Sequence, residues 1–315
     1  MKNQADTNHT VYQTRRFTLA LATSALTPTE IIQLEQRSGM SLAQLTSLQV
    51  SVLASLPTDA IATTPTLTET LTPQADNTEA SAANADADAC INSNGNSNRP
   101  LVDAEDSRHA QDFNAHRRAR ASVNAAPRLY LSYFIHQPLL EQPMDSGRLA
   151  KQLGWQAWQP QQVAFCDYLW EHTCLECFIA GAASEYVEIN ASPVGPYAIY
   201  HFSDYRQPAT LPPPPLYRGS SLAIDKQPLA DRQRAHIDWQ SDMLRTLNAD
   251  ESAYPLANSL SRHFSLDLSQ LPVTLLPLTQ LHPCVILMLG EIPLYYAPQH
   301  AQPADFHNRA HWQPL

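Results

Sequence analysis

Residues 168–206, YLWEHTCLECFIAGAASEYVEINASPVGPYAIYHFSDYR, decide the fold of this chain. Three runs rich in aromatic, β-branched and Cys residues occupy positions 169–179, 185–191 and 197–202. Small residues separate the first run from the second, and a segment with two Pro and one Gly separates the second from the third. Strand-forming composition between turn residues is typical of consecutive strands. The stretch therefore predicts a three-stranded antiparallel meander.

The two-residue period of a strand assigns these side chains to faces. One face of the first expected strand carries Trp170, His172, Cys174, Glu176 and Phe178. The second expected strand presents Glu188 and Asn190 on one of its own faces. An indole and several polar side chains on adjoining strands form the part of the sequence that points most directly to a function.

The composition limits the class of protein. The chain has 315 residues with Pro 25 and Gly 8, and it contains long polar tracts, so we expect one domain with disordered segments. The formal net charge of -10 argues against nucleic acid and against an anionic membrane surface as partners. No apolar run of the sequence is long enough to span a bilayer.

The cysteine count bears on location. Cys 5 is an odd count for a disulfide framework, so we expect reduced thiols and a cytoplasmic protein. The alternative is export, because residues 14–22, TRRFTLALA, are similar to a twin-arginine signal. The competing interpretation of this segment is an edge strand, since Phe17, Leu19 and Leu21 alternate with polar or small residues.

Short alternating or apolar runs recur along the chain. We expect further strands at residues 17–21, 47–53, 129–135, 220–224, 264–268, 285–289 and 294–297. A helical turn or two is expected at residues 29–37. Many short strands with Pro, Gly and Asn turns predict an all-β protein, a two-sheet antiparallel β-sandwich of jelly-roll-like form.

Composition also divides the chain. We expect a disordered tail at residues 1–14 and the first strands at residues 15–56. Residues 57–126 are mostly Ala, Thr, Asn, Asp, Ser and Pro, with too little apolar surface to offset the entropy of ordering, and predict a disordered insertion. Residues 127–315 form the main body, in which residues 225–258 predict a partly helical insertion.

Three blocks of the sequence carry a family resemblance, LWEHTCLECFI, YVEINASPVGPYAIYHFSDYR and YYAPQHAQPADFHN. The residues that carry it are Leu169-Trp170, Thr173-Cys174, Glu176, Phe178, Tyr186-Val187-Glu188, Asn190, Ser192-Pro193, Asp204-Tyr205-Arg206 and Asp305-Phe306-His307. At these residues the chain resembles bacterial DOMON-like domain proteins, which are similar to family-nine carbohydrate-binding modules. The resemblance covers residues 16–53 weakly and residues 129–315 well, apart from 225–258; residues 57–126 have no counterpart.

The resemblance implies a β-sandwich with a cleft on one sheet that binds a sugar or a related small polar ligand without catalysis. Trp170 and Glu176 look like the aromatic and acidic members of such a site, and Glu188 and Asn190 look like its polar ligands. Tyr296 stands where these relatives often have a Trp and would form a second aromatic wall. The rim residues would be His300, Asp305 and His307.

The residue types suit a sugar, because a ring's C–H face stacks on an aromatic plane while its hydroxyls bond to carboxylates and amides. The structural alternative is that Trp170 belongs to the core and Glu176 is a buried acid bonded within the chain. Glu176 and Glu188 could instead be the acid and base of a glycoside hydrolase. A further alternative is an interaction or scaffold domain that recruits protein partners through residues 57–126.

The sequence supports redox, zinc or haem chemistry less than it supports ligand binding. Cys174 and Cys177 form a CxxC, but on a strand their side chains point to opposite faces, which favours a structural role over redox or zinc chemistry. We therefore expect no cofactor. The alternative is haem held by Met144 and His136, since other DOMON domains bind haem through a Met and a His.

Overall fold

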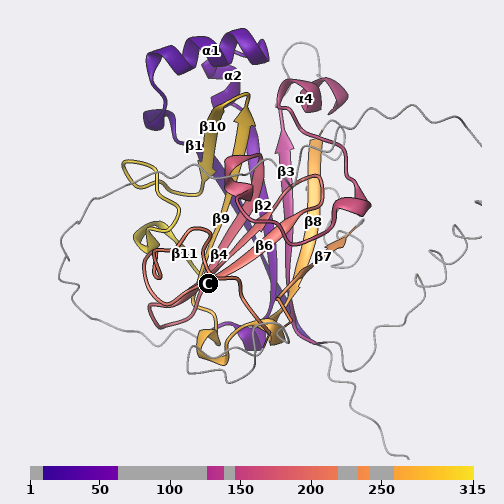
Figure 1. Ribbon diagram of the computed structural model, residues 1–315, viewed down its shortest axis with the longest axis vertical. Coiled ribbons are helices and arrows are strands. Elements are labelled where there is room, and N and C mark those ends of the chain that lie inside the picture. Colours follow the sequence, from indigo (N-terminus) through magenta and orange to yellow (C-terminus); the bar gives the residue numbers. More distant parts are fainter. Residues whose placement is uncertain (1–9, 63–125, 138–145, 219–232, 241–258) are drawn as a thin grey trace, which may run out of the picture.

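The computed structural model describes residues 10–62, 126–137, 146–218, 233–240 and 259–315. In this part of the chain one antiparallel sheet dominates (Figure 1). Its strands are β1 (Tyr12–Leu21), β2 (Gln49–Pro57), β3 (Arg128–His136), β4 (Cys174–Ala180), β5 (Tyr186–Ala191), β6 (Tyr197–Phe202), β7 (Ile237–Gln240), β8 (Ser259–Asp267), β9 (Gln280–Leu289), β10 (Ile292–Ala297) and β11 (Gln313–Pro314). The strand order is β6-β5-β4-β9-β10-β1-β2-β3-β8-β7, and β11 pairs with β9.

Strand β1 joins the two halves of this sheet. Its residues from Tyr12 to Leu19 pair with β2, whereas Ala20 and Leu21 pair with β10. One half therefore consists of β1, β2, β3, β8 and β7, and the other of β6, β5, β4, β9 and β10. Because one strand serves both halves, the sheet turns a corner without losing its main-chain hydrogen bonds.

Irregular chain crosses the gap between the two outer strands, β6 and β7. The Leu216 amide donates to the Ile199 carbonyl of β6 at 2.8 Å, and the Ala235 amide donates to the Leu216 carbonyl at 2.8 Å. The chain continues from Ala235 directly into β7. The sheet therefore nearly closes into a barrel, which protects most of its edge.

The core lies inside this near-barrel, and both halves contribute to it. Val52 of β2, Leu131 of β3, Leu175 of β4 and Val285 of β9 are among its fully buried side chains. Tyr133 of β3 is buried there as well, and its hydroxyl donates to the main-chain carbonyl of Glu176 in β4 at 2.6 Å. This hydrogen bond crosses the core from one half of the sheet to the other.

Helices lie at one end of the sheet (Figure 1). They are α1 (Pro28–Ser38), α2 (Leu42–Thr46) and α4 (Ser146–Gln152). Thr27 and Glu30 form a capping box at the start of α1, and Gly39 ends it with a left-handed φ of 66°. Leu34 and Leu45 are buried and extend the core between the helices and the strands. Among the described residues no helix is both long and apolar enough to cross a membrane.

The structure confirms a mostly β, antiparallel protein, including the central meander and the helix near residues 29–37. It differs from the expectation in several elements, among them α2 and β11, which were not expected. Residues 14–21 are not an edge strand but lie in β1 at the centre of the strand order. Residues 237–240 form a strand in a region expected to be partly helical, because Ile237 packs into the core beside β8. Helix α4 was not expected from the sequence.

Several expectations fall outside the described residues. These are most of the tail at 1–14, residues 63–125 of the insertion expected at 57–126, the strand expected at 220–224, and much of the insertion expected at 225–258. The expected pair of separate sheets is replaced by one continuous sheet with two halves.

Removing the hydroxyl that crosses the core should weaken the fold. The variant Tyr133→Phe leaves the Glu176 carbonyl without this donor, and we expect the free energy of unfolding to fall by about 1–2 kcal/mol. Urea unfolding monitored by circular dichroism measures the change. Tyr130→Phe, at a partly exposed position on the other face of β3, is the matched control and should change stability by less. Equal effects from both variants would contradict this role for Tyr133.

Candidate functional site

The candidate site lies on the outer face of β4, β5, β6 and β9, on the opposite side of the sheet from the barrel core. On this face Glu176 of β4 is opposite Asn190 of β5 and Cys284 of β9. Glu188, one row along, is opposite Phe178 and Tyr200. Cross-strand partners share a face of the sheet, so the register brings two acids and an amide together.

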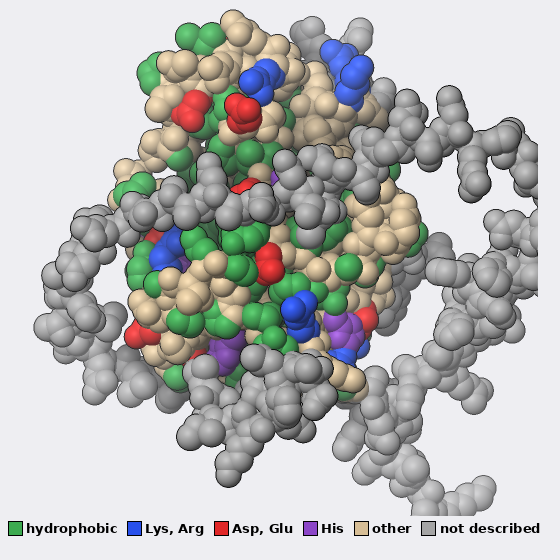
Figure 2. Space-filling view, viewed as in Figure 1, with side chains coloured by type: hydrophobic (Ala, Val, Ile, Leu, Met, Phe, Trp, Pro, Cys, Tyr) green, Lys and Arg blue, Asp and Glu red, His purple; other side chains and the backbone are tan. Residues whose placement is uncertain are grey.

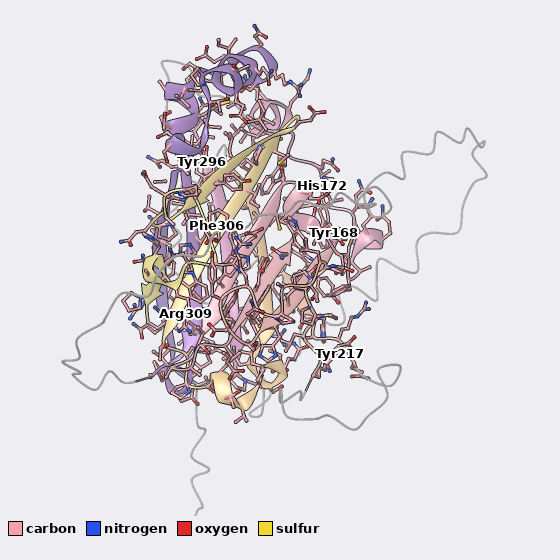
Figure 3. The ribbon with its side chains drawn as sticks, turned by 60° about the vertical axis from the view of Figure 1, so that its left-hand side comes forward. Tyr168, His172, Tyr217, Tyr296, Phe306 and Arg309 are labelled. Atoms are coloured by element: carbon pink, nitrogen blue, oxygen red, sulfur yellow. The ribbon has the colours of Figure 1, made fainter. Side chains whose placement is uncertain are left out.

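Two segments cover this face and bury it. Residues 163–172 run beside β6, where the Cys166 amide donates to the Tyr197 carbonyl at 2.9 Å. The C-terminal segment, residues 298–312, places Phe306 and Trp312 on the sheet in a second apolar cluster. In Figure 3, Tyr168 and His172 of the first segment lie toward the right of the view, and Phe306 and Arg309 of the second lie toward the left.

The Arg309 side chain holds the C-terminal segment at the β4–β5 turn. Its guanidinium donates to the main-chain carbonyls of Ala183 and Gly181 at 2.5 and 3.0 Å, and also to Oε1 of Gln280. The turn is tightly packed, because a Cβ added at Gly181 would lie 2.5 Å from the Leu275 carbonyl oxygen. Only Gly fits at this position without a shift of the main chain.

Glu176 is the most unusual group of the face. It is 2% exposed, and its Oε1 has no hydrogen-bond partner in the described part of the chain. Burial, and after it the charge of Glu188, raises the pKa of the Glu176 carboxyl well above its ordinary value. A buried carboxyl oxygen without a donor is costly, so this position requires an explanation.

Glu188 has more partners than Glu176. Its Oε1 accepts a hydrogen bond from Nδ2 of Asn190 at 2.7 Å, and its Oε2 lies 3.7 Å from Nε2 of His307. Burial raises the pKa of Glu188 to about 7, against the opposing effects of the Asn190 hydrogen bond and the Arg206 charge. Glu188 therefore changes charge near neutral pH, and the pKa of Glu176 is raised in the same direction by burial and by the charge of Glu188.

A hydrogen-bond chain orients His307. The Tyr186 hydroxyl accepts from the main-chain amide of Arg206 at 3.1 Å and lies 2.7 Å from Nδ1 of His307. In the tautomer in which this hydroxyl donates to Nδ1, the ring proton sits on Nε2, the nitrogen beside Glu188. Burial lowers the pKa of His307 to about 3, so His307 faces Glu188 as a neutral ring.

Asp305 fixes the rim of the face. It accepts from the Tyr205 hydroxyl at 2.6 Å and from the Arg206 guanidinium at 2.8 Å. It also accepts from the main-chain amide of His307 at 3.0 Å. Arg206 itself has a left-handed φ of 51°, a conformation that non-Gly residues adopt at a cost. At the rim of the site, the Asp305 carboxylate thus links the C-terminal segment to Tyr205 and Arg206 in the turn after β6.

Trp170 does not project from strand β4. The strand begins at Cys174, and Trp170 lies in the 3₁₀ turn Leu169–Glu171, so the expected common strand face for Trp170, His172 and Glu176 is wrong. Tyr168, with a left-handed φ of 61°, precedes this turn and redirects the chain. The half-buried Trp170 ring instead packs edge-on against Tyr200, the cross-strand partner of Glu188.

Tyr296 does not join the site. It pairs with Val285, which shares the core face with Leu175, and its hydroxyl donates to the Leu45 carbonyl at 3.0 Å. Tyr296 is therefore on the wrong side of the sheet to form an aromatic wall. His300 donates from Nε2 to the Ala20 carbonyl and lies near β1, away from the acids. Of the three expected rim residues, Asp305 and His307 do adjoin them.

Sequence reasoning missed Tyr186 and Arg206 as members of the site. Tyr186 precedes Glu188 by two residues, so the strand period places it on the same face and was a usable signal. Arg206 has no comparable signal, because its place depends on the turn after β6 and on contact with Asp305, about a hundred residues later in the chain. Such contacts depend on tertiary packing rather than on local pattern.

Most of the described cysteines are free thiols. Cys174 lies on the site face and Cys177 in the core, so the expected opposite orientation of the CxxC side chains is confirmed. Cys174, Cys177 and Cys284 are free, whereas Cys166 is disulfide-bonded, so the expectation of reduced thiols fails at Cys166. Within the described ranges, no group of three or more Cys, His, Asp and Glu side chains is arranged to hold a metal ion.

The alternative of haem held by Met144 and His136 receives no support from the described residues. His136 ends β3, on the other half of the sheet from Glu176, and Met144 lies outside the described residues. Charged side chains on the face shown in Figure 2 are scattered among hydrophobic ones. Glu176 and Glu188 differ from these surface charges, because they lie close together and are buried under the covering segments.

The chain was compared with protein families, with curated proteins and with solved structures. No family model matches the chain, and neither a curated protein nor a solved structure does so.

Glu188 should make stability depend on pH. Its pKa is raised on folding from about 4.5 to about 7, so the folded state binds the proton more tightly and stability is lost as pH rises through this window. His282 and His307, whose pKa values are lowered to about 3, contribute the opposite slope. The measurement is therefore the difference in unfolding free energy between wild type and Glu188→Gln at pH 4.5 and pH 7.5.

We expect the wild type to lose up to about 3 kcal/mol relative to Glu188→Gln across this range. Glu171→Gln, at an exposed position in the neighbouring turn, should leave the pH profile unchanged. Parallel profiles for wild type and Glu188→Gln would mean that Glu188 is solvated in the folded protein.

Proposed function

We propose that this chain is a DOMON-like, non-catalytic domain that binds a carbohydrate or a related small polar ligand against Glu176, Glu188 and Asn190. In this proposal the two halves of the sheet correspond to the two layers of a DOMON-like sandwich. The observation that carries it is the buried Oε1 of Glu176, which has no hydrogen-bond donor within the described chain. A ligand hydroxyl or amine would supply the missing donor.

Aromatic rings next to the acids support a ligand with an apolar face. Tyr200 lies opposite Glu188 on the same face, and Trp170 and Phe165 pack against the Tyr200 ring. Phe178 lies on the other side of Glu188. Rings beside carboxylates suit sugars, because sugars present C–H groups to the rings and hydroxyls to the acids.

Binding requires one of the covering segments to move, since Glu176 and Glu188 are only 2% and 4% exposed. The C-terminal segment is the better candidate. On the Asp305 side it is held by the contact with Arg206, whose side chain is 53% exposed, and exposed ion pairs contribute little to stability. This contact can therefore open at lower free energy than the strands beneath it, while Arg309 keeps the end of the segment at the β4–β5 turn.

A ligand screen tests the proposal. Isothermal titration with mono- and oligosaccharides should detect a binder whose affinity falls about tenfold or more in Glu176→Gln and in Trp170→Ala. Glu171→Gln, adjacent to Trp170 but exposed, is the matched control and should bind as the wild type does. Saccharide binding that is unchanged in both site variants, or no saccharide binding at all, would overturn the proposal.

Glycoside hydrolysis is a second candidate, favoured by the raised pKa values of the two acids. An acid that keeps its proton beside one that titrates near neutrality resembles an acid and base pair. Turnover of chromogenic glycosides that disappears in both Glu176→Gln and Glu188→Gln would establish it. Turnover that persists in either variant, or its absence from the wild type, would exclude these residues as catalysts.

A further inference from the structure

We propose that the ligand group received between Glu176 and Glu188 is a cationic amine, such as the ammonium of an amino sugar or of an alkylamine. This inference rests on the proposed function and specifies its ligand. It follows from three properties of the site: its hydrogen-bonding groups, its charge and its rings.

The hydrogen-bonding groups are mainly acceptors. Oε1 of Glu176 has no donor in the described chain, and Oε2 of Glu188 has only the His307 ring at 3.7 Å. The Asn190 amide is the donor among these three side chains when both acids are ionised, and one of its two N–H groups donates to Oε1 of Glu188. A hydroxyl brings lone pairs that need donors of their own, whereas an ammonium brings three donors and no acceptor. The ammonium therefore fits this set better.

The charge of the site leads to the same conclusion. Two carboxyl groups on neighbouring strands repel each other when both are ionised, and the proximity of Glu188 contributes to the raised pKa of Glu176. His307 faces them as a neutral ring, and the Arg206 guanidinium is bonded to Asp305. An ammonium between the acids would supply the balancing charge and let them ionise.

The remaining titratable groups beside the two acids are hydroxyls and thiols. They are the hydroxyls of Tyr186, Tyr200 and Tyr295 and the thiols of Cys174 and Cys284, and the Phe178 ring adjoins them. Burial raises the pKa of the Cys174 thiol well above its ordinary value, so it adds no charge near neutral pH. The rings add to the preference, because a cation over an aromatic face is attracted by the ring quadrupole.

Cation binding would be linked to proton release. The ammonium favours the ionised carboxylates, so the affinity should rise as pH increases through the pKa of Glu188, and protons should leave the protein on binding. A neutral hydroxyl ligand has no such preference for the ionised form. Proton release therefore separates the two ligand classes by a signal independent of affinity.

The experiment uses matched ligand pairs with the full chain: glucosamine with glucose, ethanolamine with ethylene glycol, and putrescine with 1,4-butanediol. Titration calorimetry in two buffers of different ionisation enthalpy gives both the affinity and the number of protons released. We expect at least one amine to bind about tenfold or more tightly than its matched alcohol, with proton release. Glu188→Gln should remove the amine preference and the proton release, and Glu171→Gln should keep both.

The outcomes separate this inference from the proposed function. Equal or tighter binding of an alcohol, lost in Glu176→Gln, would overturn the amine inference and leave ligand binding at this face intact. An amine preference that persists in Glu188→Gln, or that disappears at 0.5 M NaCl without proton release, would reflect attraction to the net negative chain and would also overturn it. Absence of any binding that depends on Glu176 would overturn both proposals.

Discussion

The buried carboxyl of Glu176 is the constraint on which this account depends. It projects from β4 onto a sheet face that two segments cover, and its Oε1 has no donor within the described chain. The same residue's carbonyl accepts the Tyr133 hydroxyl from inside the barrel. The main chain at Glu176 is thus held from the core side, and the strand period directs its side chain to the opposite, covered face.

The surroundings of this carboxyl raise its pKa well above the ordinary value, chiefly through burial. Asn190, its cross-strand partner, donates to Glu188, and the His307 ring also lies beside Glu188. The Cys174 thiol, a weak donor, is the hydrogen-bond partner of Glu176, whose Oε1 has no partner within the described chain. A protein that needed only stability would gain by an apolar residue at position 176. This cost at position 176 is the reason for proposing that the carboxyl meets a group that arrives from outside.

The sequence predicted what depends on local pattern. The meander, the shared face of Glu176 and Phe178, and the opposite orientation of Cys174 and Cys177 all follow from the two-residue period of a strand. The error at Trp170 arose because Tyr168 takes a left-handed conformation that ends the pattern before the strand begins. Tyr296 was assigned through a resemblance rather than through its face, and the register with Val285 places it in the core. The covering of the site by residues 298–312 required contacts between distant parts of the chain.

The most direct test of the account is the proton on Glu176. Carbon-13 NMR of the chain labelled at the Glu side-chain carboxyls, with Glu176→Gln to assign the resonance, follows its titration. We predict that this carboxyl stays protonated well above the ordinary pKa of Glu and ionises at lower pH when ligand is bound. A Glu176 resonance that titrates near 4.5, as a solvated Glu does, would contradict it.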